Sequence, residues 1–92
     1  SMPNQHIKIE GEPVKVGSEM FCEILLPAIQ ALSAITTPKQ MLLVHAGILT
    51  AMHGSLIATE GKIMADSFFE MMAKKLKDVP SPRPPATKSI PG

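Results

Sequence analysis

The spacing of apolar residues predicts that the chain is helical from about residue 18. Apolar side chains recur every three or four residues, which places them on one side of an α-helix. In the first segment they are Met20, Phe21, Ile24, Leu25, Ala28, Ala31, Leu32 and Ile35. Ser18 is the expected N-cap, and Pro27 should kink this helix because proline cannot donate to the carbonyl of Glu23. The first helix is therefore predicted to span about 18–35.

A second helix is predicted to begin at Pro38. Thr37 is a favourable N-cap, proline suits the first helical position, and a glutamine follows at Gln40, the third position. This combination is a capping box. The apolar period then continues to about Lys77.

Small residues repeat along this second helical segment with a period of seven. The repeat consists of three glycines, each followed four residues later by an alanine: Gly47, Ala51, Gly54, Ala58, Gly61 and Ala65. Seven residues make nearly two helical turns, so the six positions share one face of a helix. A glycine inside a helix costs about 1 kcal/mol relative to alanine. The repeat therefore predicts that a second helix approaches this face closely, with Phe68 and Met72 extending the interface.

Two arrangements of residues 38–77 fit this pattern. We favour one continuous helix, because the seven-residue period runs through Gly61 to Ala65. In the alternative, Gly61 ends a helix, and helices near 18–35, 38–59 and 62–77 form an antiparallel bundle. A continuous helix of about 40 residues would be about 60 Å long, and the first helix could cover less than half of it. The remaining apolar surface predicts self-association, most simply as a two-fold dimer.

The ends of the chain are predicted to be non-helical. Ser1 and Met2 are interpreted as the remnant of an expression tag, and the residues up to 17 as an extended arm or a short β-hairpin, because apolar and polar residues alternate around a Glu-Gly-Glu-Pro turn. Residues 18–79 form the predicted helical oligomerisation domain. Residues 80–92 form a proline-rich tail. Part of it resembles a ligand for a polyproline-binding groove, with a solvated tail as the alternative; this part is Pro82, Arg83, Pro84 and Pro85.

Composition and charge support a helical protein in a reducing compartment. The chain is 45% hydrophobic, but its only aromatic residues are three phenylalanines, and seven methionines contribute to the apolar side chains. Small and unbranched side chains lose little freedom in helices. The net charge of +1 argues against a nucleic-acid-binding protein. The single cysteine, Cys22, lies in an apolar run and is expected to be a buried, inert thiol. No secretory signal is recognised, so a cytoplasmic location is expected.

Candidate ligand-binding residues are few. His45 and His53 are eight residues apart, so one chain cannot bring both to one metal ion. A symmetric interface could bring copies together, with Glu23 or Glu60 assisting, in a metal-binding or proton-sensing role. A pocket between protomers near these histidines, Lys8 and Lys15 would suit a small ligand. No cofactor and no metal are predicted from one chain.

The carboxylates of the second segment do not indicate catalysis. Asp66 and Glu70 lie one turn apart, and each has a lysine four residues away, at Lys62 and Lys74. Such pairs are typical of a solvated helix face. The sequence contains no recognisable nucleophile–base pair, phosphate-binding loop or Cys/His cluster. An enzyme is therefore not predicted.

A membrane helix is an alternative for part of the chain. The eighteen residues from Met41 to Ala58 carry no formal charge, and their small-residue spacing is common where membrane helices pair. Two histidines, Thr50 and Ser55 in this segment, and the lack of Trp and Tyr, favour a soluble protein instead.

The sequence thus predicts an all-α, homo-oligomeric helical bundle that acts by binding, as an adaptor, regulator or inhibitor of a larger partner. A ligand-sequestering oligomer and a small membrane-inserted protein are the alternatives.

Overall fold

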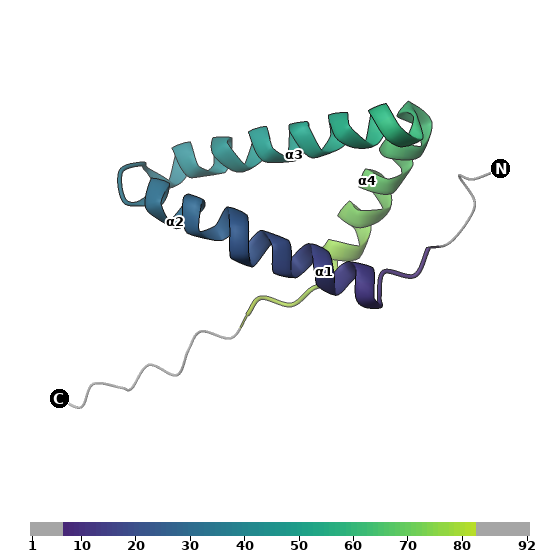
Figure 1. Ribbon diagram of the computed structural model, residues 1–92, viewed down its shortest axis with the longest axis horizontal. Coiled ribbons are helices and arrows are strands. Elements are labelled where there is room, and N and C mark those ends of the chain that lie inside the picture. Colours follow the sequence, from purple (N-terminus) through teal and green to yellow (C-terminus); the bar gives the residue numbers. More distant parts are fainter. Residues whose placement is uncertain (1–6, 83–92) are drawn as a thin grey trace.

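A computed structural model describes residues 7–82, which are mostly helical and contain no strand. The helical segments are α1 (Glu12–Met20), the π-helical turn η2 (Phe21–Leu25), α2 (Leu26–Ser33), α3 (Pro38–Glu60) and α4 (Lys62–Lys77). The first three are continuous, and we call residues 12–33 the α1–α2 helix (Figure 1). The all-α prediction is confirmed.

The predicted hairpin at the N-terminus is wrong, because α1 begins there instead. Gly11 is the N-cap, with φ 98°, and its carbonyl accepts hydrogen bonds from the amides of Val14 and Lys15 at 3.1 and 3.2 Å. Pro13 lies in the first turn, where its missing N–H is not needed, and Glu12 places a negative charge at the positive end of the helix. The Glu-Gly-Glu-Pro segment is therefore a helix start. Ser18, the predicted N-cap, lies inside α1.

The sequence predicts a kink at Pro27, and the structure has a π turn, η2, directly before this residue. The amide of Leu26 donates to the carbonyl of Phe21, five residues earlier, instead of the usual four. Proline cannot donate to the carbonyl of Glu23, and its ring needs space on the preceding turn. A widened turn supplies that space, and the helix continues through α2 without ending.

The boundary between the α1–α2 helix and α3 is the capping box that the sequence predicts. The amide of Gln40 donates to Thr37 Oγ1 at 3.1 Å, and the amide of Thr37 donates to Gln40 Oε1 at 2.9 Å. Pro38 is the first residue of α3. Two exposed amides at the start of this helix therefore have side-chain partners.

The favoured continuous helix over 38–77 is wrong, and the alternative break at Gly61 is observed. α3 ends at Glu60, and Gly61 adopts φ 91° and ψ 159°, a conformation that is essentially restricted to glycine. The amide of Gly61 closes α3 by donating to the Ile57 carbonyl, and its own carbonyl accepts from Ala65 in α4. One residue thus ends one helix and begins the next.

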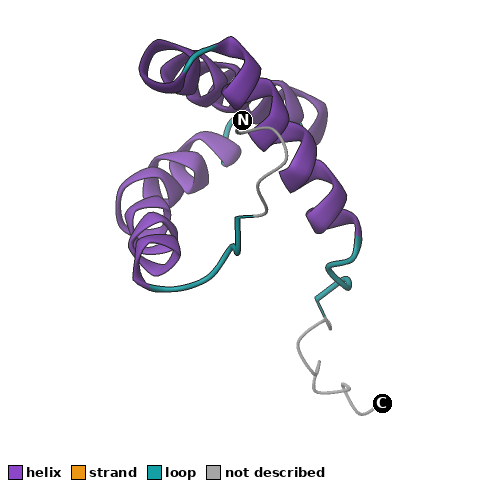
Figure 2. Ribbon diagram, turned by 90° about the vertical axis from the view of Figure 1, so that its right-hand side faces the viewer, coloured by secondary structure: helices purple, strands orange, loops and turns teal. Residues whose placement is uncertain are grey.

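The helices form an open frame, not a closed bundle. The α1–α2 helix and α3 approach one another beside the turn that joins them and then diverge, while α4 turns back beneath α3 (Figure 1). The view turned by 90° also shows the α1–α2 helix and α4 apart below α3 (Figure 2). Of the described residues, only Ala65 is buried, with 1% of its surface exposed. Cys22, predicted to be buried, is exposed, because no other helix covers that side of η2.

Candidate interaction surface

The small-residue face of α3 is open in the single chain. Gly47 and Gly54 have no atom within 4 Å of the position where a Cβ would lie, and both are exposed. Ala51 and Ala58 are exposed as well. No helix in the described part of the chain therefore explains the absence of larger side chains at these four positions.

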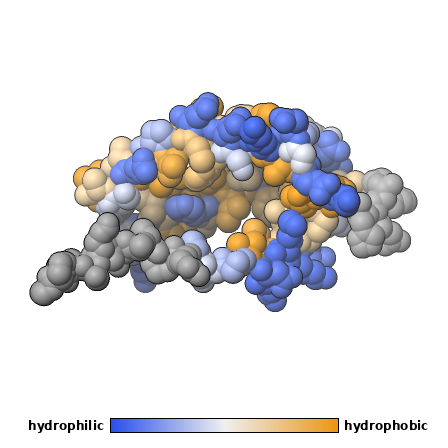
Figure 3. All heavy atoms as spheres, turned by 90° about the horizontal axis from the view of Figure 1, so that it is seen from below, coloured by the Kyte–Doolittle hydropathy of each residue, from blue (hydrophilic) through white to orange (hydrophobic). Residues whose placement is uncertain are grey.

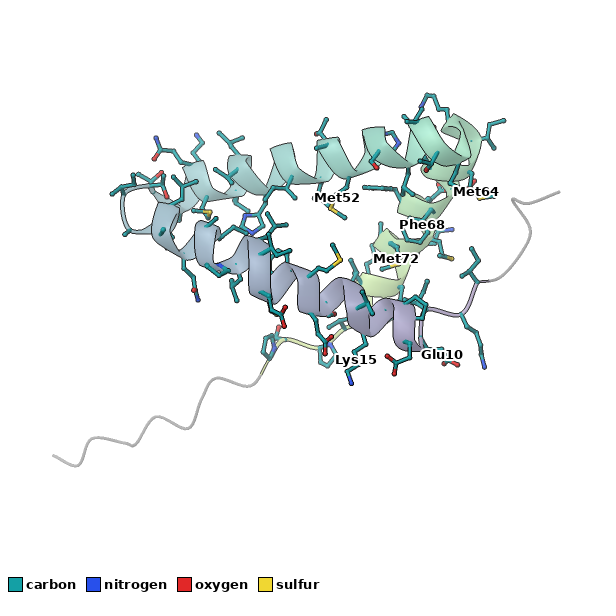
Figure 4. The ribbon with its side chains drawn as sticks, viewed as in Figure 1. Glu10, Lys15, Met52, Met64, Phe68 and Met72 are labelled. Carbon is teal, nitrogen blue, oxygen red and sulfur yellow. The ribbon has the colours of Figure 1, made fainter. Side chains whose placement is uncertain are left out.

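The break at Gly61 separates this face from the residues that follow it. Ala65 packs at the junction of α3 and α4, and Phe68 and Met72 are half-buried on α4. In Figure 4 the side chain of Met52 extends from α3 toward the space within the frame, and Phe68 and Met72 lie on α4 beside it. The predicted interface residues thus form two surfaces, one on α3 and one on α4, in place of a single continuous stripe.

Large apolar residues are exposed on every helix. Seen from below, they lie between hydrophilic residues over much of the surface (Figure 3). The largest exposed fractions are those of Ile35 at 81%, Ile63 at 73% and Leu42 at 72%. The others are Ile7, Val14, Val16, Met20, Phe21, Ile24, Leu25, Leu43, Leu49, Met52, Leu76 and Val79. A fully exposed large side chain presents about 180 Å², so these fifteen residues together expose about 1,500 Å² of surface. This area is the sum over residues on all the helices and not the area of one contiguous patch.

A polar cluster connects α3 to α4 beside the break. His53 Nε2 lies 2.6 Å from Asp66 Oδ1, and Lys62 Nζ lies 2.6 Å from Asp66 Oδ2. A carboxylate can only accept, so the Nε2 atom of His53 carries the hydrogen. The ring of His53 also meets that of Phe69 edge-on, with centroids 5.0 Å apart. The contacts of His53 with Asp66 and Phe69 join α3 to α4, whereas the pair of Lys62 with Asp66 lies within α4.

The same cluster lowers the pKa of the Asp66 carboxyl below its ordinary value of 3.8. Hydrogen bonds from Lys62 and then from His53 are the largest causes, because both favour the charged carboxylate. The predicted pairing of Lys62 with Asp66 is therefore confirmed. The structure shows no ion pair between Glu70 and Lys74, both of which it describes.

The candidate metal-binding residues are not brought together within one chain. His45 is exposed, and its Nδ1 atom donates to the Met41 carbonyl at 2.8 Å. Glu23 is exposed on η2, on a different helix, and His53 is engaged with Asp66. Within residues 7–82, no group of three His, Cys, Asp or Glu side chains is placed to hold a metal ion. Whether symmetry-related copies join these residues stays a prediction.

The proline-rich motif falls largely outside the described part of the chain. Pro82 is described and exposed, whereas Arg83, Pro84 and Pro85 lie beyond residue 82. The predicted partner motif therefore stays a prediction. Lys8 and Lys15, which the ligand-binding alternative invokes, are both exposed.

Helix α3 has the length and composition of a membrane-spanning helix. It contains 23 residues, and none of its most apolar 18-residue window is buried. Core helices of soluble proteins can be equally apolar, but they are buried by their own chain. Among residues 7–82, no segment buries the apolar window of α3.

Comparison with known proteins provides no relative: no family model, curated protein or solved structure matches this chain.

Sequence reasoning missed the contact between His53 and Asp66. The two residues are 13 positions apart, a spacing that does not bring them together on one continuous helix. They meet only because the chain turns at Gly61. The sequence did contain a signal for this turn. Gly61 is flanked by the polar residues Glu60 and Lys62, and this pattern fits a helix end better than the interior of a straight helix.

Proposed function

We propose that this chain is a self-associating helical protein that acts by binding, as an adaptor, regulator or inhibitor of a larger protein. The observation that carries the proposal is the absence of a core: among the described residues Ala65 alone is buried, while large apolar residues together expose about 1,500 Å² of surface. Each partner in a standard protein–protein interface contributes about 800 Å². A second copy could therefore cover part of this surface and leave the rest for another protein.

The open small-residue face of α3 supports a close helix–helix contact in the assembly. Glycine inside a helix is unfavourable, and neither Gly47 nor Gly54 is needed to avoid a contact within its own chain. A partner helix against Gly47, Ala51, Gly54 and Ala58 supplies a reason for both. The same partner helix would also cover the exposed small-residue face of α3.

Native mass in detergent-free buffer tests this proposal. A dimer has about twice the chain mass of 9.9 kDa, so light scattering should give about 20 kDa. A monodisperse monomer of 9.9 kDa would refute self-association.

The double substitution Ala51→Leu with Ala58→Leu tests the interface. Both alanines are exposed, and no helix within residues 7–82 lies over the small-residue face. Leucine should therefore fit the single chain but force a partner helix away, and the measured mass should fall to that of a monomer. Helix content by circular dichroism is the control for folding. A dimer of unchanged stability would show that this face is not the interface.

The second candidate is a membrane protein with α3 as the inserted helix. It is favoured by the length of α3 and because none of the most apolar 18-residue window of α3 is buried. Against it, polar residues occur along the helix, including His45, Thr50 and His53. The same mass measurement separates the two candidates, because an inserted α3 would make the protein insoluble without detergent.

A further inference from the structure

We propose that Gly61 is a hinge, at which the chain exchanges between the bent form described above and a less populated extended form. In the extended form α3 and α4 join into one helix, from Pro38 to Lys77. The motion takes place within one chain, so this inference does not rest on the proposed self-association. It assigns the protein a second conformation and a surface that only this conformation exposes.

The two forms differ at a single residue. The amide of Gly61 donates to the Ile57 carbonyl, and the amide of Ala65 donates to the Gly61 carbonyl, both at the four-residue spacing of an α-helix. The extended form would keep both hydrogen bonds. Only the dihedral angles of Gly61 would change, from φ 91° and ψ 159° to helical values. Such a change at one element-terminal residue is typical of a hinge, and glycine can adopt either conformation.

The bent form lacks three helical hydrogen bonds at the break. The amides of residues 62–64 are the first three of α4, and no side chain caps them. In the extended helix they would donate to the carbonyls of residues 58–60, four positions earlier. An amide–carbonyl hydrogen bond is modestly favourable compared with hydrogen bonds to water. These three bonds therefore favour the extended form.

The charged residues at the break have the wrong sign for helix ends. Glu60 places a negative charge at the negative end of α3, and Lys62 places a positive charge at the positive end of α4. The last turn of α3 has no basic residue, and the first turn of α4 has no acidic residue. In the extended form neither charge lies at a helix end, so this cost disappears. The pair of Lys62 with Asp66 lies within α4 and does not distinguish the two forms.

The contacts that hold the bent form are few. Ala65 is buried at the junction, and His53 contacts Asp66 and Phe69. Asp66 is exposed, so solvent weakens its pairing with His53. These two residues are 13 positions apart and would be separated by about 20 Å in the extended helix. Because these contacts oppose the three hydrogen bonds and the end charges, we expect the extended form in about 1–10% of molecules.

Extension would expose a surface that the bent form covers. Ala65 and Phe69 are four residues apart, on one face of α4, and both would lose their contacts at the junction. A molecule that contacts this face would bind only the extended form and would shift the population toward it. The hinge thus controls when this face is accessible.

The two mirror-image forms of alanine at position 61 provide a matched pair of variants. L-Alanine, in Gly61→Ala, favours a right-handed helix and disfavours φ 91°. D-Alanine has the mirrored preferences, so it fits the observed angles and disfavours the right-handed helix. The two variants contain the same atoms and differ only in which form they favour. Ligation of synthetic peptides provides the D-alanine variant.

Single-molecule energy transfer between dyes at Lys39 and Lys77 distinguishes the two forms. Both residues are exposed, near the ends of α3 and α4 that lie away from the break. In the extended helix they would be about 57 Å apart, 38 residues at about 1.5 Å each. In the bent form they are closer, because α4 turns back beneath α3 (Figure 1). Cys22→Ser removes the native thiol. At single-molecule dilution the copies do not meet, so self-association does not affect the result.

The wild type should show a minor population of low transfer efficiency. The D-alanine variant should lack it, and Gly61→Ala should raise the ratio of extended to bent form about thirtyfold or more. Glu60→Lys improves the charge at the end of α3 and should lower this ratio about threefold or more. The matched control Glu70→Lys makes the same charge change inside α4 and should leave the ratio unchanged.

Two results would overturn the hinge. One is a wild type that is indistinguishable from the D-alanine variant, and the other is equal transfer efficiency in the two alanine variants. Neither result bears on whether copies associate, which the native mass decides separately. A monomeric wild type with a minor extended population would refute self-association and leave the hinge intact.

Discussion

The substitution Gly61→Ala is expected to convert α3 and α4 toward one continuous helix. Gly61 has φ 91° and ψ 159°, and no atom lies within 4 Å of the position of its missing Cβ. Alanine is therefore disfavoured by the backbone conformation and not by crowding. Such a conformation costs a residue with a side chain about 1–3 kcal/mol. In a continuous helix, alanine is also about 1 kcal/mol more favourable than glycine.

Together these two effects shift the balance by about 2–4 kcal/mol toward the straight form. The interactions that straightening would break total about 2 kcal/mol, the lower end of that shift. The edge-on packing of His53 against Phe69 contributes about 1 kcal/mol, and burial of the Ala65 methyl contributes about 1 kcal/mol. The hydrogen bonds of Asp66 are exposed to solvent and add little. A net shift of even 2 kcal/mol changes the ratio of the two forms about thirtyfold.

Distances between two spin labels measure the change. Labels at Thr50 and Ala73, both exposed, would lie about 35 Å apart on a straight helix, 23 residues at about 1.5 Å each. In the broken form the distance is shorter, because α4 turns back beneath α3. Cys22→Ser removes the native thiol, and dilution with unlabelled protein suppresses distances between copies. The control Gly17→Ala changes a glycine inside α1 with open space around it and should leave the distance unchanged. An unaltered distance in Gly61→Ala, with unaltered thermal stability, would refute the reasoning.

Two further predictions concern individual contacts. Thr37→Ala removes the capping box and should lower the free energy of unfolding by about 1 kcal/mol, measured by thermal or urea unfolding, whereas Thr37→Ser should retain most of the stability. The folded-state pKa of Asp66 is lowered, so its stabilising contribution is present above its ordinary value of 3.8 and is lost as the pH falls through the folded-state pKa. As the pH falls from neutral through this range, the distribution of label distances across Gly61 should therefore broaden slightly in the wild type and less in Asp66→Asn; identical pH responses would show that the Asp66 carboxylate does not contribute to the junction.

Local sequence patterns predicted the structure correctly where they are compatible with only one conformation. The Thr37 to Gln40 segment forms its capping box whatever lies beside the helix, because both hydrogen bonds join residues three positions apart. The pairing of Lys62 with Asp66 depends only on helical spacing. Both predictions are confirmed because neither needs information about distant parts of the chain.

Other features were ambiguous because the same residues serve two structures. A Gly-Glu-Pro segment can form a hairpin turn or start a helix, and an isolated hairpin is the less stable of the two. Gly61 fits a seven-residue repeat and also fits a helix end. Only the tertiary contacts of Ala65 and His53 decide between them. The expected burial of Cys22 assumed a neighbouring helix that the single chain does not place there.

The π turn determines which side of the α1–α2 helix faces inward. Because the Leu26 amide bonds to Phe21, one extra residue is inserted in that turn, which rotates everything before it by about 100° relative to an uninterrupted α-helix. Deleting one residue from Phe21–Leu25 would restore α-helical register and turn Glu12 and Glu19 about the helix axis by the same amount, away from their present outward direction. The five-residue π turn thus determines on which side of the α1–α2 helix Glu12 and Glu19 are exposed to solvent.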